Sequence, residues 1–167
     1  TNMEGMFYSA EKFNQPLNFD TSNVTDMSYM FRNTKSFNQA LNFNTSNVKK
    51  MERIFAYSDN FNQPLNNWDV SKVTNMAGMF ESSIFNQDLN NWNTSNVTDM
   101  SYMFSYATRF NQPLNFDTSK VTNMMSMFCN AYNFNQNISS WNFDNIINCD
   151  YMFDNAKAFL DKYNNSD

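Results

Sequence analysis

The chain has 167 residues, a formal net charge of −5 and no histidine, and hydrophobic residues make up 41% of it. The missing histidine excludes histidine-based general acid–base catalysis and histidine metal ligands. Eleven basic against 16 acidic residues argue against nucleic-acid binding. No apolar run approaches the roughly 18 residues that a membrane-spanning helix needs, so we expect no membrane insertion of these residues.

A phenylalanine followed by Asn-Gln opens a repeat of 24 or 25 residues. The repeated phenylalanines are Phe13, Phe37, Phe61, Phe85, Phe110 and Phe134, and Phe159 opens a broken further copy. Each copy continues with a leucine or isoleucine, an aromatic residue, a valine or isoleucine, and a segment close to Met-x-x-Met-Phe. Copies with tryptophan at the aromatic position carry one extra residue, which predicts a loop corner there.

These regular apolar columns predict a solenoid, which is a stack of coils with one coil per copy. A coil of 24 or 25 residues cannot bury so many large side chains alone, but it can bury them against its neighbours. Coils joined by parallel ladders lie about 4.8 Å apart, so six coils would form a rod roughly 30 Å long.

Two segments within each copy favour different local structures. The β-branched residues of Thr-Ser-Asn-Val-Thr favour a strand, and the spacing of Met-x-x-Met-Phe favours a helical turn. A helix starting at an N-cap such as Ser22 or Ser46 is the alternative. We expect an α/β solenoid with one short parallel strand and a helical turn per 24–25-residue repeat.

The Asn-Gln pair after each phenylalanine predicts a structural polar ladder. Stacked amides can bond each other and the backbone of the next coil, which satisfies polar groups at a corner. The predicted ladder consists of Asn14, Gln15, Asn38, Gln39, Asn62, Gln63, Asn86, Gln87, Asn111, Gln112, Asn135 and Gln136.

The residue after the aromatic column alternates between aspartate and asparagine. In chain order this column reads Asp20, Asn44, Asp69, Asn93, Asp117 and Asn142. Proline precedes the leucine column only in the aspartate copies. The pattern suggests a duplicated two-coil unit, and it avoids repulsion of roughly 1 kcal/mol per pair between carboxylates on adjacent coils.

The full motif, Phe-Asn-Gln-x-Leu-Asn-(Asn)-Trp/Phe-Asp/Asn-Thr-Ser-Asn-Val-Thr-Asp/Asn-Met-x-x-Met-Phe, resembles the repeat of BspA-type leucine-rich-repeat surface proteins of bacteria, over residues 1 to about 159. The resemblance implies a leucine-rich-repeat-like, right-handed stack of coils. It also implies an extracellular or cell-surface location and adhesion to matrix proteins or other bacteria. It carries over no catalytic residue. The residues themselves predict no metal site and no cofactor, because the column of Asp20, Asp69 and Asp117 lacks the Gly-rich acidic turns of calcium-binding repeats.

Residues 1–159 are expected to form one repeat domain of about six and a half coils, followed by a polar tail or the start of a cap at 160–167. Residues 1–7 match residues 74–80, so the chain begins within a coil and is interpreted as a fragment of a longer array. Unpaired end coils predict possible end-to-end self-association. Cys129 and Cys149 are expected to be buried as small apolar groups.

Positions that vary between copies are the candidates for ligand binding. Tyr29, Arg53 and Tyr102 share the position between the two methionines, and Lys50 precedes the first methionine of its copy. Tyrosine and arginine dominate protein-binding hot spots. The alternative for Lys50 is a simple pairing with Asp26 on the preceding coil.

The sequence therefore predicts a non-enzymatic adhesion or protein-binding module whose partner is a host or bacterial surface protein or a glycan. A structural stalk that displays another domain is the alternative. A third hypothesis is ice binding through a threonine column that comprises Thr21, Thr45, Thr94 and Thr118.

Overall fold

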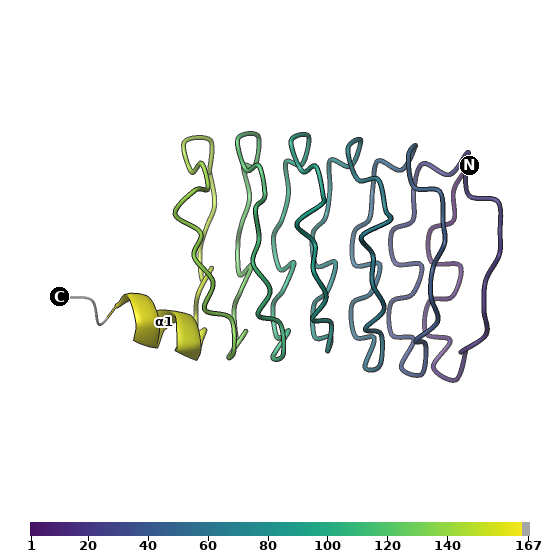
Figure 1. Cartoon of the computed structure of the whole chain (residues 1–167), viewed down its shortest axis with the longest axis horizontal. Coiled ribbons are helices and arrows are strands. Elements are labelled where there is room, and N and C mark those ends of the chain that lie inside the picture. Colours follow the sequence, from purple (N-terminus) through teal and green to yellow (C-terminus); the bar gives the residue numbers. More distant parts are fainter. Residues whose placement is uncertain (165–167) are drawn as a thin grey trace.

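The computed structural model describes residues 1–164, in which successive copies of the repeat lie side by side along one axis (Figure 1). Each copy forms one coil, and equivalent residues of adjacent coils are joined by a single parallel bridge. The bridges are Asn2–Asp26, Asp26–Lys50, Lys50–Asn75, Asn75–Asp99, Asp99–Asn123 and Asn123–Asn148. Copies that are adjacent in the sequence are therefore adjacent in space.

Backbone hydrogen bonds continue on both sides of each bridge. The N–H group of Thr25 donates to Thr1 O of the preceding coil at 2.9 Å. Further along the same coil, alternate N–H groups donate to the following coil instead, as from Met27 to Lys50 O and from Tyr29 to Glu52 O. Most of these backbone N–H groups have no carbonyl acceptor within their own coil. Each coil therefore depends on its neighbours for its hydrogen bonds as well as for its core.

The Met-x-x-Met-Phe segments form consecutive β-turns, which corrects the expected helical turn in each copy. Met30 N–H donates to Met27 O and Thr34 N–H donates to Phe31 O, both at 3.2 Å. Tyr29 (φ 60°) and Asn33 (φ 59°) occupy the third positions of these turns, in the left-handed region of a type II turn. A helix would direct every N–H group along its own axis, whereas here alternate N–H groups reach the next coil.

Two columns of stacked phenylalanine rings run through the core. Phe55 and Phe80 belong to one column with ring centroids 5.9 Å apart, and Phe61 and Phe85 belong to the other at 6.3 Å. Within a coil the columns meet, with the Phe55 and Phe61 centroids only 4.0 Å apart. These four side chains are fully buried. Each aromatic pair contributes about 0.5–1.5 kcal/mol beyond the area that it buries.

The tryptophans form hydrogen bonds that the phenylalanines at the same position cannot form. The indole N–H groups of Trp92 and Trp141 donate to Leu65 O and Leu114 O of the preceding coil, both at 3.1 Å. Trp68 donates more weakly to Leu41 O at 3.4 Å. The extra residue in these copies is accommodated by a turn, in which Trp92 N–H donates to Leu89 O at 3.0 Å.

The helix α1 (Lys157–Tyr163) is the only α-helix among residues 1–164, and it packs against the last coil (Figure 1). Phe159 stacks on Phe153 at 4.1 Å, and Lys162 Nζ donates to Asn135 O at 3.0 Å. The predicted tail or cap at 160–167 thus begins inside α1, and its residues 165–167 lie outside the described residues. No helix within residues 1–164 has the length and apolarity needed to cross a bilayer.

The last coil is only partly covered by α1. Ile147 is 86% exposed and Tyr151 is 71% exposed. Cys149 is also exposed, so the expectation that it is buried is wrong, whereas Cys129 on the preceding coil is half-buried. The reason is that a core position is buried only where another coil packs against it.

Candidate binding face

Tyr29, Arg53 and Tyr102 occupy equivalent third positions of their turns, with φ between 49° and 60°. Gly78, on the coil between those of Arg53 and Tyr102, has the same conformation with φ 60°. A non-glycine residue in this region costs about 1–2 kcal/mol, so the conformation persists only where the surrounding structure imposes it. All three side chains are half-buried. The coil-to-coil hydrogen bonds impose the strained conformation, and the side chains contact adjacent coils.

Arg53 links four coils. Its Nη1 lies 3.2 Å from Glu52 Oε1 on its own coil, and its Nε lies 3.0 Å from Glu81 Oε2 on the next. The guanidinium carbon lies 5.9 Å from the ring centroid of Tyr102, one coil further. The fourth coil is that of Tyr29, whose hydroxyl donates to Glu52 Oε1 at 2.5 Å. Tyr29, Arg53 and Tyr102 are therefore brought together, with Glu52 and Glu81 between them.

The two glutamates organise the charge of this network. The hydrogen bond to Glu52 raises the pKa of Tyr29, and burial together with the bond to Glu81 raises the pKa of Tyr57. Burial disfavours the charged form of Arg53, but the hydrogen bonds to Glu81 and Tyr29 and the charges of Glu81 and Glu52 together outweigh burial and keep the pKa of Arg53 above its ordinary value. The tyrosines stay neutral hydrogen-bond donors and Arg53 stays charged at physiological pH.

A second arginine joins the network from the side. The guanidinium carbon of Arg32 lies 5.3 Å from the ring centroids of both Tyr8 and Tyr57, and its Nη1 donates to the Tyr8 hydroxyl at 2.6 Å. The Tyr57 hydroxyl donates in turn to Glu81 Oε1 at 3.0 Å. An open hollow of about 240 Å³ is lined by Tyr8, Arg32, Asn33 and Tyr57.

We call this connected surface the tyrosine–arginine band. It comprises Tyr8, Tyr29, Arg32, Glu52, Arg53, Tyr57, Glu81 and Tyr102. The sequence analysis missed Tyr8, Arg32, Glu52, Tyr57 and Glu81. The available signal was that Arg32 and Glu81 directly follow the phenylalanine that closes the Met-x-x-Met-Phe segment.

Lys50 stands apart from the tyrosine–arginine band. Its Nζ lies 3.9 Å from Asp26 Oδ2, and its side chain is 61% exposed. An exposed pair of this kind contributes about 0–1 kcal/mol. The geometry therefore matches the alternative interpretation of Lys50 as a partner of Asp26, and it removes Lys50 from the candidate face.

The Asn-Gln pairs lie in rows that cross the coils at one corner. Asn62 N–H donates to Asn38 Oδ1 at 3.0 Å, and Gln63 Nε2 donates to Asn38 O at 3.1 Å. Gln39, Gln112 and Gln136 bond the asparagine of the preceding coil in the same way, whereas Gln15 and Gln87 show no such bond. The amides of these pairs thus form hydrogen bonds from coil to coil.

The threonine column faces the interior. Thr21, Thr45, Thr94 and Thr118 are at most 2% exposed. Their hydroxyls donate to backbone carbonyls of the following coil, as from Thr45 to Asp69 O at 2.9 Å. The ice-binding hypothesis for these residues is therefore wrong, because a buried hydroxyl cannot contact an ice surface. No group of at least three Cys, Asp or Glu residues suited to a metal ion occurs within the described part of the chain.

Coils that share one aromatic core and whose backbone hydrogen bonds join adjacent copies define a repeat protein. The chain belongs to the family described as "Mycoplasma protein of unknown function, DUF285", whose model matches residues 1–83, 42–117 and 64–167. The matches overlap, as is typical of a motif that recurs along the chain. No curated protein and no solved structure matches the chain.

Proposed function

We propose that this chain is a non-enzymatic protein-binding module of the adhesion type, carried on a bacterial surface or secreted. In this proposal the chain is related to BspA-type surface proteins and folds as a right-handed, leucine-rich-repeat-like solenoid. It needs no cofactor. The tyrosine–arginine band is the proposed contact surface, and the partner is a host or bacterial surface protein.

The observation that carries this proposal is the connected array of tyrosines and arginines. Such residues supply most of the binding energy in protein interfaces. Arg32 is held between Tyr8 and Tyr57, and Arg53 is held by Glu52 and Glu81. Side chains that are already ordered lose less conformational entropy on binding. Two arginines balance two glutamates, so the band favours a partner of mixed polarity over a highly charged one.

Binding to a panel of immobilised matrix proteins and bacterial cell-surface extracts tests the proposal. The triple variant Tyr8→Ala, Arg32→Ala and Tyr57→Ala removes one end of the band. The control is Tyr106→Ala, which alters a 53% exposed tyrosine outside the band, at the position equivalent to Tyr57. We expect the triple variant to lose binding and the control to retain it. Equal binding by both would overturn the assignment of the band, and binding of glycans alone would change the partner class.

A stalk is the second candidate, supported by the nearest-neighbour bonding of the coils. A stalk has no ligand of its own and tolerates a change in length. A variant that lacks residues 62–110, which span two copies, should then fold with the same stability per coil, as measured by circular dichroism during urea unfolding. Self-association through the end coils stays a prediction, which sedimentation over a range of concentrations tests.

A further inference from the structure

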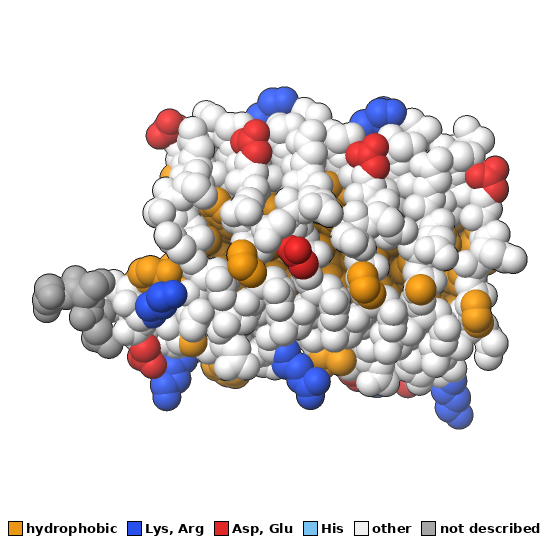
Figure 2. Space-filling view, in the orientation of Figure 1, with side chains coloured by type: hydrophobic (Ala, Val, Ile, Leu, Met, Phe, Trp, Pro, Cys, Tyr) orange, Lys and Arg blue, Asp and Glu red, His pale blue; other side chains and the backbone are white. Residues whose placement is uncertain are grey.

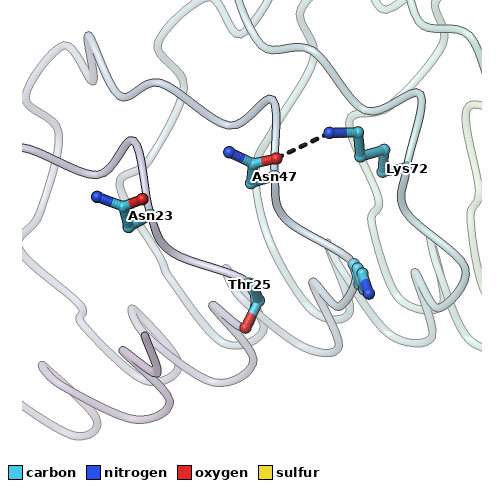
Figure 3. Close-up of a pocket in the computed structure, with 5 residues that line it drawn as sticks. Asn23, Thr25, Asn47 and Lys72 are labelled. Carbon is cyan, nitrogen blue, oxygen red and sulfur yellow. Dashed lines mark hydrogen bonds between the residues drawn. The ribbon is translucent and has the colours of Figure 1, made fainter.

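A polar depression separate from the tyrosine–arginine band lies across three consecutive coils. Its volume is about 500 Å³, and its lining residues are Asn23, Thr25, Asn47, Lys49 and Lys72. Asn23, Asn47 and Lys72 come from equivalent points of successive coils, and the Asn47 oxygen points toward the Lys72 ammonium (Figure 3). In Figure 2 charged side chains gather along the upper and lower edges of the molecule.

The positive charge in this depression is not neutralised by a carboxylate of its lining. Lys72 Nζ donates to Asn47 Oδ1 at 2.7 Å, and this acceptor is neutral. The orientation of the Asn47 amide is set by its other end, because Nδ2 donates to Ser22 O at 2.8 Å. An ammonium has three donors, so the Lys72 ammonium retains donors for a ligand.

Lys49 supplies a second ammonium, for which the described residues provide neither an ion pair nor a hydrogen bond. Asp69 is three residues before Lys72, and the Lys72 charge contributes to lowering the pKa of Asp69 after the hydrogen bonds from Ser71. Asp69 does not line the depression, and its Oδ1 accepts the Ser71 N–H at 2.9 Å. The lining is thus a pair of cations among amide and hydroxyl groups.

This chemistry selects among ligand classes. No aromatic residue lines the depression, so it offers no ring on which a nucleobase could stack, and its apolar surface comes from the lysine methylenes and the Thr25 methyl group, which can contact the carbon atoms of a sugar ring. Two ammonium groups are too few to hold a nucleic acid on a chain with net charge −5. Amides and hydroxyls pair well with sugar hydroxyls, and the ammonium groups pair with an anion. We propose that Lys49, Lys72 and the adjoining asparagines bind an acidic saccharide, a sugar ring that carries a carboxylate or a sulfate.

The chain contains a matched control for this site. Lys120 Nζ donates to Asn96 Oδ1 at 2.7 Å, and Asn96 Nδ2 donates to Ser71 O at 2.8 Å, which repeats the Lys72–Asn47 arrangement two coils along. The position equivalent to Lys49 is Thr98 there, so the second ammonium is missing. Lys120→Gln therefore removes the same net charge and the same kind of hydrogen bond without touching the proposed site.

The test is a titration of the whole chain by isothermal calorimetry and by amide chemical shifts. The probes are a uronate disaccharide, a sulfated disaccharide, a neutral disaccharide and the dipeptide Glu-Glu. We expect saturable binding of one or both acidic sugars, which also identifies the anion, and no binding of the neutral sugar. Lys49→Gln and Lys72→Gln should each weaken binding roughly tenfold, and added salt should weaken it further. Lys120→Gln should bind as the unmodified chain does.

Three outcomes would overturn the proposal. These are the absence of saturable binding by either acidic sugar, equal binding of the neutral sugar, and an equal loss of affinity in Lys120→Gln. Binding of the dipeptide alone would replace the saccharide with an acidic peptide. The proposal does not depend on the tyrosine–arginine band, because the two surfaces share no residue. A protein partner can therefore fail while the saccharide binds, or the reverse.

Discussion

Arg53 crosses the following coil directly over Gly78. A Cβ atom built on Gly78 would lie 2.7 Å from Arg53 Cγ, which is closer than Cβ atoms come to packed neighbours, and 3.1 Å from Arg53 Nε, which is a tight contact. Because Gly78 has no side chain, there is room above it for the Arg53 side chain to reach Glu81 and Tyr102. A missing side chain on one coil thus determines how side chains from its neighbours meet.

Gly78→Ala should displace Arg53 and break the centre of the tyrosine–arginine band. The φ of 60° adds about 1 kcal/mol of backbone strain, and the collision with Arg53 adds to it. We expect a loss of about 1–3 kcal/mol in the free energy of unfolding, measured with urea. Gly5→Ala is the control, because Gly5 has φ 63° and its new Cβ would meet only Tyr8 Cβ at 3.8 Å. Equal losses in the two variants would show that Arg53 plays no part.

Trp141→Phe should destabilise the protein more than Trp92→Phe does. Both lose an indole hydrogen bond to the preceding coil. Leu65 O keeps a second donor in the Trp68 N–H at 3.0 Å, whereas Leu114 O has no other bond among residues 1–164. A buried carbonyl without a partner costs about 1–3 kcal/mol. Urea unfolding of both variants measures the difference, and a larger loss in Trp92→Phe would contradict this account.

Acid should weaken the fold through Asp69 and Asp117. The hydrogen bonds from Ser71 and Ser119 to these carboxylates hold the pKa of each below its usual value. A lowered pKa in the folded state stabilises the fold above the unfolded pKa of about 3.9, and this contribution disappears as the pH falls through the lower folded pKa. The urea concentration at the unfolding midpoint of the unmodified chain should therefore decrease when the pH is lowered below about 4.

Replacing both aspartates with asparagine should reduce that drop, because asparagine at Asn44 and Asn93 accepts the same backbone N–H without a charge. Urea midpoints between about pH 7 and 2.5 measure the effect. Asp59→Asn changes one exposed aspartate elsewhere and shows the effect of removing a single surface charge. An unchanged acid profile in the double variant would refute this role for the two carboxylates.

The alternation of Asp and Asn along the coils predicts a salt-dependent penalty. The double variant Asn44→Asp and Asn93→Asp places carboxylates on five consecutive coils, from Asp20 to Asp117. Each adjacent pair adds roughly 1 kcal/mol of repulsion in water, and salt screens it. The thermal midpoint should fall more at low salt than at high salt. A fall of the same size at both would rule out the charge explanation.

The sequence alone determined which residues enter the core. The recurrent Phe, Met, Val and Leu positions lie in the buried cluster, since a side chain repeated at a fixed interval meets its own equivalent on the next coil. It did not determine the structure of Met-x-x-Met-Phe, because an apolar spacing of three and four residues fits consecutive β-turns as well as a helix. The sequence also did not show that the Thr45 side chain is buried, because threonine occurs on both the inner and the outer face of a coil.

Only the tertiary structure decided the partners of the surface residues. Arg53 contacts Glu81 and Tyr102, which are 28 and 49 positions away in the sequence, because the gap above Gly78 lets the side chain cross a coil. Lys50 pairs with Asp26 instead, and Lys49 lines the same depression as Lys72. Repetition along the chain specifies a stack of coils, but the contacts between residues that vary from copy to copy depend on the space their neighbours leave.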